Sequence, residues 1–392
     1  MSMRLPLYFF VAFTFLTSCQ KGSGKNDCAD GFVSQDLTVK PSELLNIPLT
    51  KTDAYLGSLN QIEKGGKLYR ISRFGSKIDV YDLVSKNKIK SYSFHDSGPN
   101  HISAFGGIAF MPLGGDSLLF MNNISQLYLT HKDSILLKKT YIEDDLLSPK
   151  EYRSYGVNQV KPFLYDNKVF FIKISQYLPE SENGKNDKIL MYYDLQSKNL
   201  LEAPVHFPGK YREGIWTPAQ RLFSFANHNS KVVLNFPIED DLYIYDTESN
   251  AVTDTVKCVT SRYKKSEIQP INREITDWKM YGMYLKKQIL YWSISYNPAQ
   301  QVYYRIIVQP VTIEEDYLSE ERIQVVSPFS VMVLDKDFNV LAEDKFPGKT
   351  YDLTDFFVTD KGLWISNNNP ENPNFSEDQL SFTLFALGEK KE

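Results

Sequence analysis

The sequence predicts an all-β fold, a six-bladed β-propeller, from three observations. Phe, Tyr and Trp make up 14% of the 392 residues, and large aromatic side chains favour strands. An apolar hairpin with a polar turn recurs along the chain. The strands that precede these hairpins begin at intervals that suit propeller blades better than the shorter repeats of solenoids.

The recurring hairpin consists of a strand that ends near an aspartate, a polar turn and a second strand. Its clearest copies have their turns at residues 84–87, 196–199, 247–250 and 336–339. The strand before each hairpin begins at Lys67, Ser117, Lys168, Lys231, Gln301 and Gly362. Strands joined by short polar turns pair antiparallel, so each of the six units predicts one blade.

The two ends of the chain are expected to close the ring. The last unit has strand segments at 362–367 and 380–386 but no outer strand after them. Residues 36–48 form a strand-like segment with no unit before it, which can supply the fourth strand of the last blade. Such closure removes exposed strand edges, which invite aggregation. Deleting this N-terminal strand should therefore unfold the ring.

Two other folds share parts of this pattern. A pair of β-sandwiches would also contain many short strands, but its turns would not recur at this period. A mixed α/β fold would need helices, and only residues 313–322, rich in Glu, have a helical pattern. A solvated charged turn is the alternative for that segment.

The N-terminal segment 1–27 predicts export and lipid attachment. Arg4 precedes an apolar run at 7–16, too short to span a bilayer, and Leu16-Thr17-Ser18-Cys19 follows. This tetrapeptide resembles the bacterial lipobox, which implies cleavage before Cys19 and acyl chains such as palmitate on that cysteine. An ordinary secretory signal that contains a cysteine is the alternative. By resemblance to lipoprotein sorting, Gln20 favours the outer membrane and leaves the leaflet open.

We therefore expect a signal peptide at 1–18, a lipidated tether at 19–35 and one propeller domain at 36–392. The net charge of −4 does not indicate nucleic acid or an anionic membrane surface as a partner. The histidines are scattered, so neither a metal site nor a cofactor is expected. Cys28 and Cys258 could pair in an exported protein, but their spacing does not decide this.

Two repeated patterns supply candidate ligand-binding residues. Phe-Pro-Gly-Lys occurs between units at 207–210 and 346–349, and Pro-Gly by itself is a tight turn. Arginines also occur inside apolar strands, where they either pair with a carboxylate of the adjacent blade or line the channel. A cationic channel mouth for a carboxylate, sulfate or phosphate would use Arg70, Arg305, Lys210, Tyr211, Arg212, Lys349 and Tyr351.

The sequence contains no recognisable catalytic motif, such as a nucleophile elbow, a zinc-protease helix or a phosphate-binding loop. Acidic clusters at 143–145 and 239–241 could bind a cation, but exposed loop charge is the commoner explanation. Long loops at 175–187, 257–287, 309–328 and 367–379 could contact a ligand or partner.

Two functional hypotheses remain at this point. The first is a membrane-anchored, non-catalytic module that binds a small anionic or glycan ligand, or an envelope protein. The alternative is a propeller hydrolase or lyase acting on glycans or lactones. Propellers serve both purposes, so the residue types that line the channel should separate the two hypotheses.

The lipobox and the six units, together with Tyr303-Tyr304-Arg305 and Ser327-Pro328-Phe329-Ser330, resemble a family of bacterial proteins. This is a six-bladed β-propeller lipoprotein family, a domain of unknown function, of Bacteroidota-type bacteria. The likeness covers roughly residues 44–387. Its motifs are architectural, so the resemblance implies a fold and an envelope location and carries over no catalytic residue.

Overall fold

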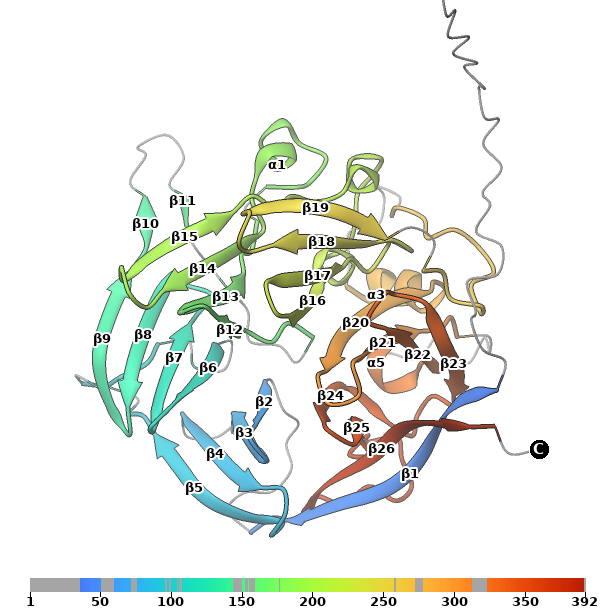
Figure 1. The fold of residues 1–392 in the computed structure, drawn as a ribbon, viewed down its shortest axis with the longest axis horizontal. Helices are drawn as coiled ribbons and strands as arrows, with labels where there is room; N and C mark the ends of the chain where they lie inside the picture. The colour runs from blue at the N-terminus through green and yellow to red at the C-terminus, as the bar shows by residue number, and fades with distance from the viewer. Residues whose placement is uncertain are drawn as a thin grey trace, which may run out of the picture. The chain divides into compact units, whose positions relative to one another are not determined.

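The structure is a computed structural model, and its described residues lie within one unit, Gly31–Glu392. They are residues 36–50, 60–71, 76–95, 97–98, 100–103, 105, 108–143, 150–151, 154, 159–175, 177–256, 259–271, 278–311 and 323–390. Six four-stranded antiparallel sheets are arranged as the blades of a propeller around a central channel (Figure 1). The predicted fold class is confirmed.

Each blade runs from an inner strand beside the channel to an outer strand at the rim. Blade 1 contains β2 (Gln61–Lys64), β3 (Lys67–Ile71), β4 (Lys77–Asp82) and β5 (Asn87–Ser93). Blade 2 contains β6 (Ala109–Gly114), β7 (Ser117–Met121), β8 (Gln126–His131) and β9 (Ser134–Thr140). The two-residue strands β10 (Ile142–Glu143) and β11 (Lys150–Glu151) pair outside the blades.

Blade 3 contains β12 (Phe163–Tyr165), β13 (Lys168–Ile172), β14 (Leu190–Asp194) and β15 (Asn199–Ala203). Blade 4 contains β16 (Ser224–His228), β17 (Lys231–Asn235), β18 (Leu242–Asp246) and β19 (Ala251–Val256). Blade 5 contains β20 (Leu290–Asn297), β21 (Val302–Val308), β22 (Phe329–Asp335) and β23 (Val340–Phe346). Five of the six second strands begin at the predicted residue, and β21 begins one residue later.

Blade 6 joins the two ends of the chain, as the sequence predicts. Its strands are β24 (Asp352–Thr359), β25 (Gly362–Ser366), β26 (Gln379–Glu389) and the N-terminal β1 (Leu37–Pro48). β1 pairs antiparallel with β26 from Leu37 opposite Glu389 to Pro48 opposite Gln379, with a bulge between Pro41 and Leu44. The ring is therefore closed by backbone pairing between strands from opposite ends of the chain.

An aspartate organises the outer turn in four blades. The side chains of Asp82, Asp194, Asp246 and Asp335 each accept hydrogen bonds from backbone N–H groups of the turn that follows. This Asx-type turn is the physical basis of the aspartate that recurs in the sequence. The N–H donors also lower the pKa of Asp82, Asp194 and Asp246, because they favour the ionised carboxylate.

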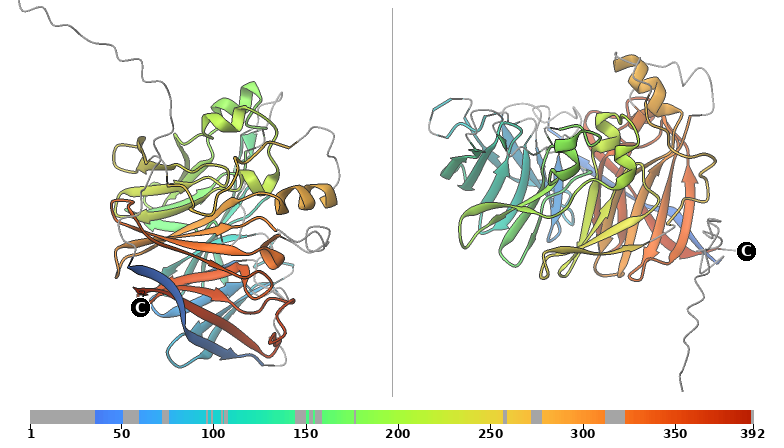
Figure 2. Two further views of the ribbon diagram at one scale, coloured as in Figure 1. Left: turned by 90° about the vertical axis from the view of Figure 1, so that its right-hand side faces the viewer. Right: turned by 90° about the horizontal axis from the view of Figure 1, so that it is seen from above.

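The helical segments lie in the long connections. They are α1 (Glu182–Asn186), η2 (Gly209–Arg212), α2 (Pro218–Arg221), α3 (Trp278–Lys286) and α5 (Ile323–Val326). Each lies between blades or between the second and third strands of a blade, and we call the face formed by these connections the loop face (Figure 2). The opposite face, formed by the turns between first and second and between third and fourth strands, is called the turn face.

Some sequence predictions fall outside the described residues. They concern the helical segment at 313–322 and the cysteines Cys19, Cys28 and Cys258, so lipid attachment and disulfide pairing stay predictions. Within the described part of the chain, no helix has the length and apolar character needed to cross a membrane.

Candidate functional site

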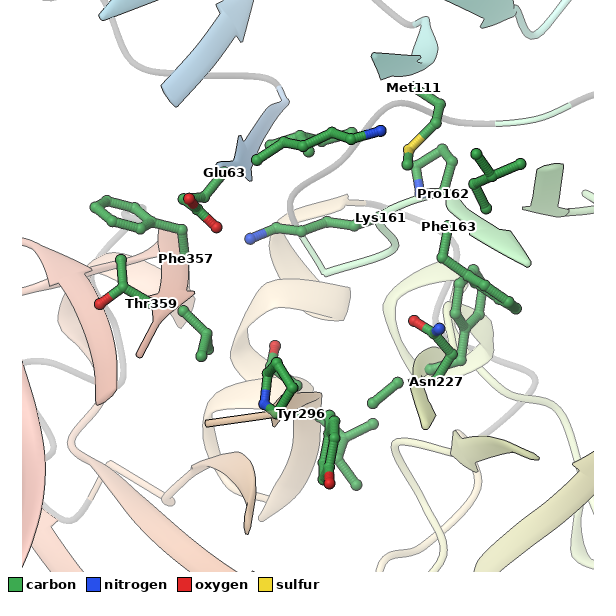
Figure 3. Close-up of a pocket in the computed structure, with 18 of the residues that line it drawn as sticks. Glu63, Met111, Lys161, Pro162, Phe163, Asn227, Tyr296, Phe357 and Thr359 are labelled. Atoms are coloured by element: carbon green, nitrogen blue, oxygen red, sulfur yellow. The ribbon is translucent and has the colours of Figure 1, made fainter. Parts of the chain in front are cut away.

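The central channel contains a cavity of about 460 Å³ to which all six inner strands contribute (Figure 3). Glu63 comes from β2, Met111 from β6, Phe163 from β12, Asn227 from β16 and Tyr296 from β20. Phe357 and Thr359 complete the ring from β24. Many of the lining residues stand at the carboxyl ends of their strands, so the cavity lies toward the turn face.

The walls of the cavity are largely apolar. Phe163, Phe225 and Phe357 are buried aromatic side chains that line it, and Ile62 and Ile294 add aliphatic surface. A cavity of this size and character, with a few polar groups placed in it, is typical of a site for a small organic molecule.

Lys161 is the most unusual polar group in the cavity. It comes just before β12, and its ammonium group donates to the carbonyl oxygen of Phe356 at 2.6 Å and lies 4.5 Å from the centre of the Phe356 ring. Burial lowers the pKa of Lys161 to about 7, and the negative charges of Asp355 and Glu63 oppose this shift. The amine therefore changes its charge near neutral pH.

Glu63 and Lys64 occupy the end of β2 and line the same cavity as Lys161. The Glu63 carboxyl group and the Lys161 amine point toward one another across the cavity (Figure 3). Burial raises the pKa of Glu63, although its Oε1 accepts a hydrogen bond from the N–H of Gly66 at 2.8 Å. Lys64 donates to the carbonyl oxygen of Pro112 at 2.7 Å, and burial lowers the pKa of its amine.

A buried polar cluster holds the Phe356 carbonyl in place. Gln61 donates to this carbonyl at 3.3 Å and accepts from Arg70 at 3.0 Å. Arg70 in turn forms a salt bridge with Asp355, 2.8 Å from nitrogen to oxygen. The backbone acceptor of Lys161 is therefore fixed by side chains from two blades.

Arg70 and Arg305 were both predicted from their place inside apolar strands. Arg70 pairs with a carboxylate of the adjacent blade, one of the two alternatives stated for it. Arg305 is fully buried, stacks 3.8 Å from the centre of the Tyr291 ring and donates to Asn235 Oδ1 at 2.7 Å. It also donates to the carbonyl oxygens of Glu239, Asp240 and Val259. These contacts tie blade 5 to blade 4.

The first Phe-Pro-Gly-Lys loop makes local contacts on the loop face. Tyr211 is buried, and its hydroxyl donates to the carbonyl oxygen of Gln220 at 2.6 Å. Lys210 donates to the carbonyl oxygen of Ile238 and lies 3.5 Å from a carboxylate oxygen of Glu267. Arg212 is exposed at the end of η2.

The second copy of this loop is held in a similar way. The N–H of Lys349 donates to the carbonyl oxygen of Val325, and Lys349 has a positive φ of 63°. Tyr351 packs edge-on against Phe329 and Phe385. None of these loop residues is among those that line the cavity, and a role for them in ligand binding stays a prediction.

The residues that sequence reasoning missed are Lys161, Lys64 and Glu63. Each stands next to or at the end of an inner strand and belongs to no repeated motif. The one signal available was polar residues at the ends of short apolar strands, as in Glu63-Lys64 and Thr359-Asp360. In the described part of the chain, no group of three or more His, Cys, Asp or Glu side chains is arranged to hold a metal ion.

Comparison with known families accounts for the fold. Residues 34–345 match the family model described as a domain of unknown function, DUF4221. The chain belongs to the DUF4221 family. A solved DUF4221 member from Bacteroides vulgatus ATCC 8482 is 26% identical, with a TM-score of 0.73 over 91% of this chain and 99% of that chain. The expected family of six-bladed propellers of unknown function is therefore confirmed, and its lipoprotein character stays a prediction.

More distant structures resemble this DUF4221 propeller weakly. A protein from Bacteroides fragilis NCTC 9343 is 12% identical, with a TM-score of 0.49 over 92% of this chain and 97% of that chain. A luciferin-regenerating enzyme is 9% identical, with a TM-score of 0.45 over 89% of this chain and 98% of that chain. Likenesses at this level carry no argument about function. No curated protein matches the chain.

Proposed function

We propose that this DUF4221 protein is a lipoprotein of the cell envelope whose propeller binds a small organic anion in its channel, without converting it. The observation that carries the proposal is that Lys64 and Lys161 both line the cavity and donate to backbone carbonyls. No carboxylate among the described residues forms a salt bridge with either amine. The charges of Asp355 and Glu63 act on Lys161 without forming a salt bridge. A ligand carboxylate at either amine would form the direct ion pair that carbonyl oxygens, with partial charges only, do not supply.

The apolar walls support an organic ligand rather than an inorganic ion. Phe163, Phe225 and Phe357 would remove carbon surface of the ligand from water, which is worth about 25 cal/mol per Å² of apolar area. The low-dielectric surroundings also strengthen the attraction between a ligand carboxylate and the two amines.

The binding proposal can be tested by calorimetry on Gly31–Glu392, the unit that contains all six blades, since the Bacteroides vulgatus relative, matched over 99% of its own chain, was crystallised. Benzoate and galacturonate are compared with benzamide and galactose. We expect an acid to bind more tightly than its neutral counterpart, and Lys161→Met to weaken the acid at least tenfold. Lys345→Met, at an exposed position on β23, is the matched control. If the wild type, Lys161→Met and Lys345→Met all bound acids and neutral compounds equally, the result would contradict the proposal.

Binding should also depend on pH in a defined direction. An anion favours protonated Lys161, whose pKa in the free protein is about 7. Affinity should therefore fall as pH rises above 7, by up to about tenfold per unit, with uptake of a proton on binding. An affinity that is constant from pH 6 to 9 would argue against contact between the ligand and Lys161.

The envelope location rests on the N-terminal segment 1–27. Several acyl chains on Cys19 would bind a membrane stably, because each buried methylene contributes about 0.8 kcal/mol. Replacing Cys19 with Ser should release the protein from the membrane fraction, whereas Cys28→Ser should leave it there. Release of both variants, or of neither, would be inconsistent with an anchor at Cys19.

Acid–base catalysis is a second candidate, because Glu63 and Lys161 face one another with the pKa of the carboxyl raised and that of the amine lowered. Such opposed shifts are typical of acid and base pairs in enzymes. If the protein is a hydrolase or lyase of glycans or lactones, the wild type should form product and the Glu63→Gln variant should not. Binding without turnover of any such substrate would favour the non-catalytic module.

A further inference from the structure

A second depression adjoins the channel cavity at the junction of blade 6 and blade 1. This depression, which we call the seam groove, has a volume of about 650 Å³. It is lined by Leu44 and Leu45 of β1, Leu83 and Val84 of the turn after β4, and Trp364 of β25. Glu63, Phe357, Thr359 and Asp360 line both the groove and the cavity, so the two adjoin one another.

The seam groove has apolar walls, is lined as well by the exposed charged side chains Glu43, Lys86 and Lys361, and is partly open to solvent. Leu44 is 58% exposed and Val84 is 87% exposed, while Leu45 and Trp364 form buried walls. Large aliphatic side chains that lie exposed beside buried apolar walls mark a surface that gains free energy when a ligand covers it. The charges of Glu43 and Lys361 at its edge pair with each other at 2.8 Å.

β1 pairs irregularly with β26 where it lines the seam groove. Between Pro41 and Leu44 the register of β1 against β26 shifts, so that an extra residue lies on the β1 side. A bulge of this kind bends a strand and redirects its side chains. The bulged part of β1 contributes Glu43 and Leu44 to the groove.

From this geometry we propose that the ligand is a straight-chain carboxylate of the fatty-acid type, with its head in the channel and its hydrocarbon chain in the seam groove. The inference rests on the proposed binding of an anion by Lys64 and Lys161 and adds the class of that anion. The Lys64 and Lys161 amines lie in the cavity, the groove adds its five apolar side chains, and the carboxylates of Glu63 and Asp360 line both. An amphiphile with one anionic end could pair with an amine of the cavity and cover the apolar side chains of the groove, whereas a sugar acid would leave those side chains uncovered.

The test compares butyrate, decanoate and decanol by calorimetry with Gly31–Glu392. Decanoate has six more methylenes than butyrate, and each methylene that is fully buried strengthens binding about fourfold. We expect decanoate to bind at least about 100-fold more tightly than butyrate. Lys161→Met should weaken both acids at least tenfold and should leave decanol unchanged.

A double variant of the groove isolates the hydrocarbon chain. Leu44→Glu with Val84→Glu changes exposed side chains, so the thermal midpoint should stay near that of the wild type. Decanoate should lose most of its advantage over butyrate, whereas butyrate affinity should not change. Leu136→Glu, a 64% exposed position on β9 outside the groove, is the matched control and should have no effect.

The results of these experiments distinguish the fatty-acid inference from the proposal of anion binding on which it rests. Equal affinities for butyrate and decanoate, or a decanoate affinity that the double variant does not alter, would overturn the fatty-acid inference. If the fatty-acid inference failed but benzoate or galacturonate still bound through Lys161, the proposal of anion binding would stand by itself. Failure of every acid tested would remove both.

Discussion

Arg70 and Asp355 form a salt bridge, with 2.8 Å between Nη1 and Oδ2, that joins the first blade to the last. Both side chains are buried, and Asp355 Oδ1 accepts no hydrogen bond from the described residues. Arg70→Met would leave the carboxylate buried without its partner. We expect a loss of about 3–5 kcal/mol in the free energy of unfolding, measured by urea denaturation at pH 7.

The double variant Arg70→Met with Asp355→Leu should recover most of that loss, because it leaves no unpaired charge. Burial raises the pKa of Asp355 and Arg70 opposes this shift, so the deficit of the single variant should shrink toward acidic pH as the carboxyl gains a proton. Lys336→Met, which breaks an exposed ion pair with Asp337, should not measurably change stability. An equal loss in the single and double variants would show that the pair matters only for packing.

The fold could be predicted from the sequence because its signals are local. In four blades the aspartate of the outer turn bonds to backbone groups two or three residues later, so the hairpins can be recognised within a short window. The candidate site could not be found in this way. Arg70 and Asp355 are 285 residues apart, and Lys161 contacts a carbonyl 195 residues away. Only ring closure brings these groups together, and no spacing in the sequence encodes it.

The two Phe-Pro-Gly-Lys loops make a matched pair for a second test. A Cβ atom at Gly348 would lie 2.1 Å from the carbonyl oxygen of Val326, whereas one at Gly209 would meet nothing within 4 Å. Gly348→Ala forces backbone to shift and should cost about 1–3 kcal/mol, while Gly209→Ala should stay within about 0.5 kcal/mol of the wild type. Thermal unfolding measures the stability of both variants. If both lost the same stability, the backbone of the second loop would be able to shift without cost.

Closure of the ring by β1 gives a third prediction. Removing residues 36–48 exposes the full edge of β26 and the apolar surface that Val39 and Ile47 cover. We expect the shortened chain to lack a cooperative unfolding transition and to aggregate, because an unpaired strand edge invites association. A synthetic peptide of residues 36–48 should restore the transition in trans. Normal cooperative unfolding without β1 would show that five complete blades and a three-stranded sixth are sufficient.

Lys161 should make stability rise with pH. Its pKa is about 7 in the folded chain against an ordinary value of 10.5, so between these values the unfolded chain binds one more proton than the folded chain. The free energy of unfolding therefore gains up to about 1.4 kcal/mol per pH unit from this residue.

Lys161→Met removes this proton difference, so its stability relative to the wild type should fall steadily from pH 8 to pH 10. Below pH 7 the wild type carries a buried charge, and there the variant should compare most favourably. Urea denaturation at several pH values measures both trends, with Lys345→Met as the exposed control. Parallel pH profiles for wild type and Lys161→Met would mean that the amine keeps its proton in the folded chain. The attraction of a ligand anion to Lys161 would then persist through pH 9.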